Sequence, residues 1–333
     1  MKKYATVFLG LLLLIAVFVG CVDGNNEPSI TSLPEPTAAP IETPTPTPAP
    51  QTTEARTRPE TDREGYALTL PEEINTIVTL GPSNAEILVA LGFGNRIIAA
   101  DRFTDDVAGL GPGVVRAFGI MDFDAEYIIE LMPDIIFVTG LTRAGGEYDP
   151  LAVISAVGIT VIYMPSSTSI NAIMEDIRFI AAVMEADEAG EAVITAMQSE
   201  IDEIRAVAAT ITTPRTVYFE ISPAPWMFSF GAGTFLHEMV ELVGATNVFA
   251  DQDGWVSVSE EALLESNPDV ILTSTDFLDD PIAEIMQRPG FDVITAVQNG
   301  DIFQITTAYS NRSSQNITKA LREIAQAVFP EYF

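Results

Sequence analysis

The chain has 333 residues and a formal net charge of −31, from 47 acidic and 16 basic residues. Such acidity argues against binding to nucleic acid and against adhesion to anionic lipid. Cys21 is the only cysteine, which excludes an intramolecular disulfide and a thiol-based metal site in the rest of the chain.

Residues 1–20 predict a secretory signal peptide. Lys2 and Lys3 precede an apolar run over residues 7–19, and a Gly-Cys pair follows it. This order is typical of exported proteins. Val19-Gly20-Cys21 also resembles a bacterial lipobox, so we expect a lipidated Cys21 that anchors the protein extracytoplasmically to the cell membrane. The alternative is an uncleaved apolar anchor over residues 4–22, which would export the same downstream chain.

Residues 21–65 are predicted to form a disordered tether. Apolar content falls from Asp23 to about Glu64, and the segment is rich in Pro, Thr, Ala and Glu, with alternating Thr and Pro over residues 43–48. Such a composition cannot bury a core, and its prolines favour an extended, semi-rigid spacer.

Predicted strands and helices alternate through the body, residues 66–333, which is typical of parallel sheets covered by helices on both faces. A strand is expected over residues 74–80, followed by a helix over residues 83–91 with Ser83 and Glu86 as a capping box. Further strands are expected over residues 97–100, 135–139, 159–163, 216–221, 270–273 and 302–306, and an amphipathic helix over residues 313–329.

An internal repeat divides this body in two. Residues 126–137 (EYIIELMPDIIF) read almost in step with residues 261–272 (EALLESNPDVIL). In each copy a short helix is expected to end before Pro133 or Pro268, because proline disfavours helical geometry in the residue before it. The repeat predicts two α/β lobes of similar construction, at about residues 66–168 and 212–333, each with a mainly parallel sheet flanked by helices.

Residues 169–211, between the predicted lobes, are expected to be helical. They contain one glycine, Gly190, and no proline, and apolar residues recur at helical spacing. We expect Gly190 to separate a lobe helix from a longer helix that bridges the lobes. A helix of about 20 residues spans about 30 Å, so it would act as a rigid strut between them.

The order of these motifs resembles that of the substrate-binding proteins of ABC importers for iron siderophores, vitamin B12 and haem. The resemblance covers essentially all of residues 66–333. It is carried by residues 80–92 (LGPSNAEILVALG), both repeats, the central helices, the turn at residues 226–233 and the closing helix after Asn311 and Arg312. It implies two lobes joined by a rigid helix, with a ligand held in the cleft between them. Because no catalytic motif is present, we expect no enzymatic activity.

Glu126 and Glu261, which begin the two repeats, match a pair of surface glutamates in this family. The resemblance implies that they dock the protein by pairing with arginines of the importer's permease subunits, one glutamate per lobe. Charge-assisted pairing at two points would fix orientation more than it would add affinity. The alternative is that each glutamate merely stabilises the N-terminus of its own helix.

The resemblance also implies a set of ligand-binding residues. Flat aromatic side chains suit planar or macrocyclic ligands, because they offer a large contact area at little conformational cost. An arginine would suit a carboxylate, hydroxamate or phosphate on the ligand, or it could pair with an acidic neighbour. The candidates are Phe103, Arg143, Trp226, Trp255, Tyr309 and Arg312.

No intrinsic cofactor is expected. His237 is the only histidine, so the chain cannot build the histidine cluster that free zinc or manganese carriers use. The expected cargo is therefore a metal that arrives already chelated: a ferric siderophore first, then cobalamin, then haem. Bare iron held by oxygen ligands stays open as an alternative. Ala308 stands near a position that is acidic in the B12-binding branch, which weakens the cobalamin interpretation.

Two other classes of function remain open at this point. Abundant carboxylates could form a hydrolase pair, although no phosphate loop, zinc signature or nucleophile elbow is present. A ligand-binding extracellular sensor would have the same sequence features as an import component. The expected partners are the permease, the chelate and the membrane through the lipid, with no nucleic acid, and the protein is expected to be a monomer.

Overall fold

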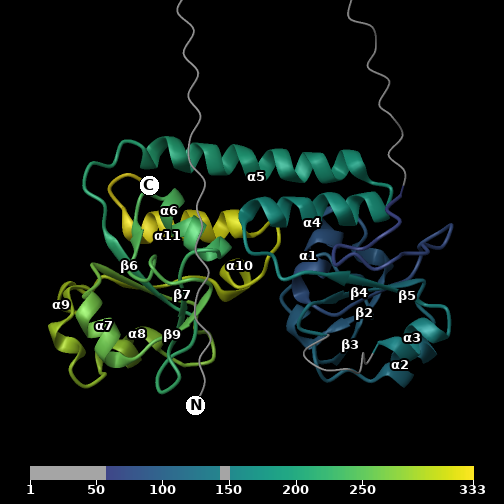
Figure 1. Ribbon diagram of the computed structural model, residues 1–333, viewed down its shortest axis with the longest axis horizontal. Coiled ribbons are helices and arrows are strands. Elements are labelled where there is room, and N and C mark those ends of the chain that lie inside the picture. Colours follow the sequence, from purple (N-terminus) through teal and green to yellow (C-terminus); the bar gives the residue numbers. More distant parts are fainter. Residues whose placement is uncertain (1–57, 143–150) are drawn as a thin grey trace, which may run out of the picture. The chain divides into compact units, whose positions relative to one another are not determined.

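The computed structural model describes residues 58–142 and 151–333. The predicted signal peptide, Cys21, most of the predicted tether and Arg143 lie outside these residues. The described residues form two α/β lobes, each with a parallel sheet flanked by helices (Figure 1), which confirms the predicted fold class.

The first lobe contains a parallel five-stranded sheet in the order β3-β2-β1-β4-β5. Its strands are β1 (Ile77–Thr79), β2 (Ile97–Asp101), β3 (Val115–Phe118), β4 (Ile135–Thr139) and β5 (Thr160–Met164). The helices of this lobe are α1 (Pro82–Ala90), α2 (Ala125–Leu131) and α3 (Ala152–Ala156), with short 3-10 helices at Gly94–Arg96 and Arg102–Thr104.

The second lobe contains a parallel four-stranded sheet in the order β11-β10-β6-β8 and a separate antiparallel pair, β7 and β9. The strands are β6 (Thr216–Glu220), β7 (Phe228–Phe230), β8 (Thr246–Asn247), β9 (Trp255–Ser257), β10 (Val270–Thr273) and β11 (Ile302–Gln304). The helices are α6 (Phe235–Leu242), α7 (Glu260–Ser266), α8 (Pro281–Met286), α9 (Thr295–Asn299), α10 (Thr307–Ser310) and α11 (Ile317–Val328), with a 3-10 helix at Phe291–Val293.

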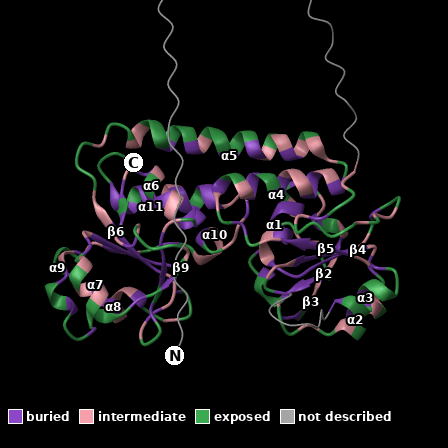
Figure 2. Cartoon of the chain, viewed as in Figure 1, coloured by how far each residue is buried: buried purple, intermediate pink, exposed green. Residues whose placement is uncertain are grey.

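The central strands of each parallel sheet, β1 and β4 in the first lobe and β6 and β10 in the second, are almost entirely buried, and Figure 2 shows the buried colour along the strands of both sheets. In β4, Ile135 and Phe137 belong to one hydrophobic cluster, whereas Ile136 and Val138 belong to another. This alternation explains why the strands read as nearly continuous apolar runs in the sequence. The first of these clusters extends through the central helices into the second lobe, so one apolar core is shared by the two lobes.

Two helices, α4 (Ile170–Val183) and α5 (Asp187–Ala208), connect the lobes. Helix α5 contacts α4 and also α6 and α11 of the second lobe, which confirms the predicted bridging helix. With 22 residues it is about 33 Å long. No helix among the described residues is both long and apolar enough to cross a membrane.

The predicted break at Gly190 is wrong. Helix α4 ends at Val183, the chain turns through Glu185 in a left-handed conformation (φ 55°), and α5 already includes Gly190. A Cβ at Gly190 would lie 2.6 Å from the Cβ of Ala181. The glycine therefore permits close packing of α5 on α4 and does not interrupt the helix.

The predicted capping box at Ser83 and Glu86 is also wrong. Helix α1 starts at Pro82 with Gly81 as its N-cap (φ 127°), and no side chain caps it. Proline suits this first position because its missing N–H would be unpaired there in any case. Glu86 is buried, and its carboxylate instead binds residues of the second lobe.

The internal repeat is visible in the structure. Helices α2 and α7 end with a left-handed residue, Met132 or Asn267, immediately before the Pro-Asp pair. Asp134 Oδ2 accepts hydrogen bonds from the backbone N–H groups of Asn75 (2.7 Å) and Thr76 (2.8 Å). In the second lobe, Asp269 Oδ2 accepts one from the N–H of Thr216 (2.8 Å). Each aspartate thus ties the end of a repeat helix to the start of a central strand.

The predicted tether boundary at residue 65 lies too far along the chain. The Arg58 guanidinium donates to the carbonyls of Pro71 (2.7 Å) and Val183 (3.1 Å). Arg63 pairs with Asp176 of α4 at 2.7 Å. Charged side chains, which look like tether in composition, therefore fasten residues 58–65 to the first lobe.

Candidate functional site

The candidate site lies at the carboxyl ends of the central strands. In the first lobe the strand order reverses between β1 and β4, and in the second between β6 and β10. Open α/β sheets bind ligands in the crevice outside the strand ends at such a switch point. The segments after β1, β4 and β6 together line one cavity of about 390 Å³.

The two lobes contribute different chemistry to this cavity. The first lobe supplies hydroxyl and amide groups together with the apolar residues Pro82, Ile87, Ile120, Leu141, Met164 and Pro165, whereas the second supplies an apolar wall and a polar loop. The polar residues of the first lobe include Ser83, Asn84, Thr139, Ser166, Ser167 and Asp176. The wall and loop of the second lobe are Ile221, Phe235, Leu236, Trp255, Asn311, Arg312 and Ser313.

The floor of the cavity is fixed by Gly81 and Asp101. The N–H of Gly81 donates to Asp101 Oδ2, and the N–H of Phe103 donates to Oδ1, both at 2.9 Å. Burial raises the pKa of the Asp101 carboxyl, while these two hydrogen bonds oppose the increase. A Cβ at Gly81 would lie 2.3 Å from Thr139 Cγ2, so only glycine fits where the segments after β1 and β4 meet.

A polar cluster joins the lobes at the edge of the cavity. Arg312 Nη1 donates to Glu86 at 2.7 Å, and its Nη2 donates to Asp106 and to the carbonyl of Phe103, both at 2.9 Å. Ser314 also donates to the Glu86 carboxylate. Burial tends to lower the pKa of Arg312, but the two carboxylates raise it overall, so the guanidinium stays charged.

A second ion pair stands behind the first-lobe wall. Asp176 is buried and accepts hydrogen bonds from Arg63 and from the hydroxyl of Ser167. Burial raises the pKa of Asp176, although both partners stabilise its charged form. The carboxylate is therefore engaged in supporting the cavity wall.

The turn that carries Trp226 is anchored by a buried cation. Arg288 Nη1 and Nη2 bind the two carboxylate oxygens of Glu220, at the end of β6, at 2.7 and 2.8 Å. Nη1 also lies 3.4 Å from the sulfur of Met227. Burial raises the pKa of Glu220, while the Arg288 guanidinium opposes the increase.

The predicted ligand-binding residues are only partly brought together. Trp255, 54% exposed, and Arg312 line the cavity. Phe103 is beside Arg312 but does not line the cavity. Trp226 is 82% exposed on the turn between β6 and β7. Tyr309 lines a smaller neighbouring cavity, with the ammonium of Lys319 4.9 Å from its ring centre. Arg143 lies outside the described residues.

Ser83 and Asn84 line the cavity but are not among the residues predicted to bind the ligand. Both occur in the segment that carries the family resemblance, and the signal that could have identified them is the Gly-Pro pair between a strand and a helix. That pair marks the segment that follows a central strand at a switch point.

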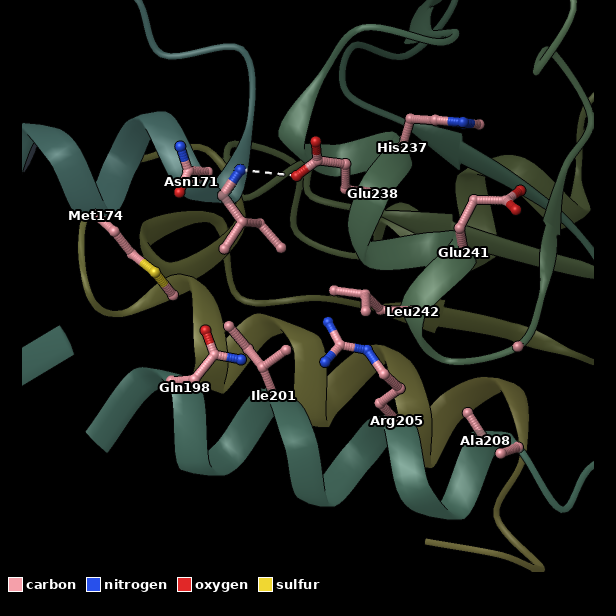
Figure 3. A pocket seen from close by; sticks show the side chains of 13 residues that line it. Asn171, Met174, Gln198, Ile201, Arg205, Ala208, His237, Glu238, Glu241 and Leu242 are labelled. Atoms are coloured by element: carbon pink, nitrogen blue, oxygen red, sulfur yellow. Dashed lines mark hydrogen bonds between the residues drawn. The ribbon is translucent and has the colours of Figure 1, made fainter. Parts of the chain in front are cut away.

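A larger cavity of about 700 Å³ lies between α4, α5 and α6 (Figure 3). Two of the charged groups around it already have partners: Glu238 accepts a hydrogen bond from the N–H of Ile170 (2.7 Å), and Arg205 pairs with Asp202 (2.6 Å). His237 borders this cavity with its Nδ1 3.4 Å from Asn247 Nδ2. Because helical segments line it and no strand ends there, we regard the smaller cavity as the functional site.

Glu126 and Glu261 occupy equivalent positions in the two lobes. Each is the second residue of its helix, α2 or α7, and each is exposed. Asp124 and Ser259 already cap these helices through their side chains. The two glutamates are therefore not required as caps.

A fold of two α/β lobes, joined by a long helix and enclosing a cavity between strand ends, defines a two-lobed solute-binding protein. The family model for periplasmic binding proteins matches residues 77–309. The chain belongs to this family.

Similar proteins support this assignment. The chain is 28% identical to the ABC transporter substrate-binding lipoprotein YvrC of Bacillus subtilis over 335 residues, covering 100% of this chain and 99% of the relative. It is 25% identical to a cobalamin-binding protein of Halobacterium salinarum over 277 residues, covering 80% of this chain and 73% of the relative.

Among solved structures, a possible iron-binding periplasmic solute-binding protein from Staphylococcus epidermidis has a TM-score of 0.69 and 26% identity. It covers 78% of this chain and 100% of its own. The relatives are transport components without enzymatic activity, so the prediction that the protein is not an enzyme is confirmed.

Proposed function

We propose that the protein is a lipid-anchored extracytoplasmic receptor that captures a metal chelate and delivers it to an ABC importer. The cavity between the two switch points carries this proposal, since it combines apolar side chains of both lobes, Trp255 among them, with hydroxyl and amide groups of the first lobe. Such a combination suits an amphipathic ligand that is largely enclosed on binding.

The metal-ligating side chains of the described residues bear on the nature of the cargo. Among residues 58–142 and 151–333, no group of three or more His, Cys, Asp or Glu side chains is arranged to hold a metal ion. A metal would therefore enter with its own ligands, as in a ferric siderophore, cobalamin or haem. The name of one relative points to cobalamin, which is such a chelate, and the name of one solved structure points to iron.

The lipid anchor is proposed from Cys21 and from the relative that is named a lipoprotein over the whole length of this chain. The placement of Glu126 and Glu261 favours import over sensing, because a two-point dock requires one charged contact on each lobe. Their partners would be arginines of the importer's permease subunits.

Ligand titration tests this function. A protein of residues 58–333 should show quenched tryptophan fluorescence with cyanocobalamin, haem or a ferric siderophore at micromolar concentrations. The matched variant Trp255→Leu should lose most of that quenching, whereas Trp226→Leu should keep it, because only Trp255 lines the cavity. If none of these chelates bound to the wild-type protein, the proposal would be wrong.

A further inference from the structure

Asn84 presents a buried hydrogen-bond donor without a partner. The residue is 2% exposed and lines the cavity, and its Nδ2 forms no hydrogen bond within the part of the chain that the structure describes. A buried amide that is left unpaired costs free energy in the ligand-free protein. No hydrogen bond of Nδ2 within the described residues therefore explains why an asparagine occupies this position.

Its place in the fold points to a ligand. Asn84 is the third residue of α1, a helix of nine residues whose N-terminus has no side-chain cap. The first turn of a helix presents N–H groups and a partial positive charge to whatever lies before it. Asn84 and Ser83 both line the cavity, so they add a side-chain amide and a hydroxyl to these N–H groups at the first-lobe switch point.

The charges around the cavity indicate which oxygen atoms this donor meets. Arg312 and Asp176 are the two charged side chains in its described lining, and each is already paired: Arg312 with Glu86 and Asp106, and Asp176 with Arg63. The described lining therefore offers no uncommitted cation to neutralise an anionic ligand. The net charge of −31 also disfavours the approach of a polyanion.

We infer that Asn84 positions the ligand by donating through Nδ2 to a neutral oxygen acceptor, and that the cavity selects chelates of little net negative charge. The apolar face of such a chelate would rest on the wall formed by Ile221, Phe235 and Trp255. Ferric trihydroxamates fit this description, because three singly charged hydroxamates balance the ferric ion, and so does cobalamin with its amide side chains. A ferric tris-catecholate, with three negative charges left over, does not fit. This inference rests on the proposed function and narrows its substrate class.

The test compares Asn84→Leu and Asn84→Asp with the wild-type protein. Asn171→Leu is the matched control, because Asn171 lies on α4 and borders the other cavity. The probes are a ferric trihydroxamate, cyanocobalamin and a ferric tris-catecholate, measured by calorimetry and by tryptophan fluorescence. Thermal unfolding without ligand is measured in parallel.

The wild-type protein should bind at least one of the two probes without negative charge, and should bind it more tightly than the catecholate. Both Asn84 variants should bind that probe about tenfold more weakly or worse, since each lacks the donor. Asn84→Leu should unfold at the same temperature as the wild type or higher, because no native hydrogen bond is lost. Asn171→Leu should leave affinity unchanged.

Several results would overturn the inference. If wild type and Asn84→Leu bound the probe equally well, Asn84 would not contact the ligand, while the proposed function would stand. Tighter binding of the catecholate would refute the charge selection. A lowered unfolding temperature in ligand-free Asn84→Leu would assign a structural role to Asn84. If the wild type bound no chelate, the proposed function would fail together with the inference.

Discussion

At the scale of a single residue, Arg312 shows that a side chain can line a cavity while its charged group binds other residues of the protein. It lines the cavity, yet its guanidinium is bound to Glu86, 226 positions away in the chain, and to Asp106. Both Arg312 and Glu86 are largely withdrawn from water, with side chains 15% and 6% exposed. A charged group that is withdrawn from water loses its hydration, so it needs a partner of opposite charge to offset that loss.

Removal of the Glu86 carboxylate should therefore be costly. We expect Glu86→Ala to lower the free energy of unfolding by about 3 kcal/mol, the size seen when one partner of a buried pair is removed. Glu86→Gln should cost less, since it keeps the shape and part of the hydrogen bonding. Denaturant titration measures both values.

The control for that experiment is the exposed pair Arg205–Asp202, whose side chains are 55% and 57% exposed. Asp202→Ala should change the free energy of unfolding by less than about 0.5 kcal/mol, as is usual for surface pairs. A loss in Glu86→Ala no larger than that in Asp202→Ala would mean that the cluster between the lobes contributes no net stability.

At the scale of elements, the repeats owe their geometry to their Pro-Asp pairs. Asp134 lies in a loop that is only partly buried, yet it accepts three hydrogen bonds from Asn75 and Thr76 through one oxygen. Burial alone would raise the pKa of Asp134, but these hydrogen bonds outweigh it and lower the pKa below its ordinary value. The folded state thus prefers the ionised carboxyl.

This preference predicts a pH dependence. A carboxyl whose pKa is lowered by folding contributes stability above its unfolded pKa of about 3.9 and loses it as the pH falls through the folded value. Asp134→Asn should lower the free energy of unfolding by about 1–2 kcal/mol at pH 7, and the difference from wild type should shrink toward pH 3 and below. Denaturant titration across this pH range measures it. A difference that stayed constant with pH would show that the charge of Asp134 is not involved.

The sequence predicted these elements unevenly, for physical reasons. Strands β4 and β10 were predicted with their observed bounds, since buried parallel strands form apolar runs that a Pro-Asp pair precedes. The break at Gly190 was wrong because a glycine inside a helix can serve the packing of its neighbour, Ala181. Asn84 was not predicted to bind the ligand, because the sequence does not show which groups the fold brings near its side-chain amide, whose Nδ2 has no hydrogen-bond partner among the described residues.

At the scale of the whole molecule, the repeat gives the two lobes matching exposed faces. Helix α2 carries the exposed pair Glu126 and Glu130, and helix α7 carries Glu261 and Glu265 at the same spacing together with one further exposed glutamate, Glu260. The bridging helix α5 packs against α6 and α11 of the second lobe and against α4, which in turn contacts α1 of the first lobe, so these faces are presented by one connected scaffold. A partner with two basic sites could engage both lobes at once.

The reversal of charge at Glu126 and Glu261, the second residues of α2 and α7, tests this dock. The double variant Glu126→Lys/Glu261→Lys should abolish chelate uptake by cells, because each proposed arginine of the permease would then meet a like charge. The double variant Glu130→Lys/Glu265→Lys introduces the same change of net charge on the same two helices, and it should retain most of the uptake. Both variants should bind the chelate as tightly as wild type, since none of the four residues lines the cavity among the residues described. Equal loss of uptake in the two variants would indicate a general effect of charge, and loss of chelate binding in the first would place these glutamates in the ligand site instead of the dock.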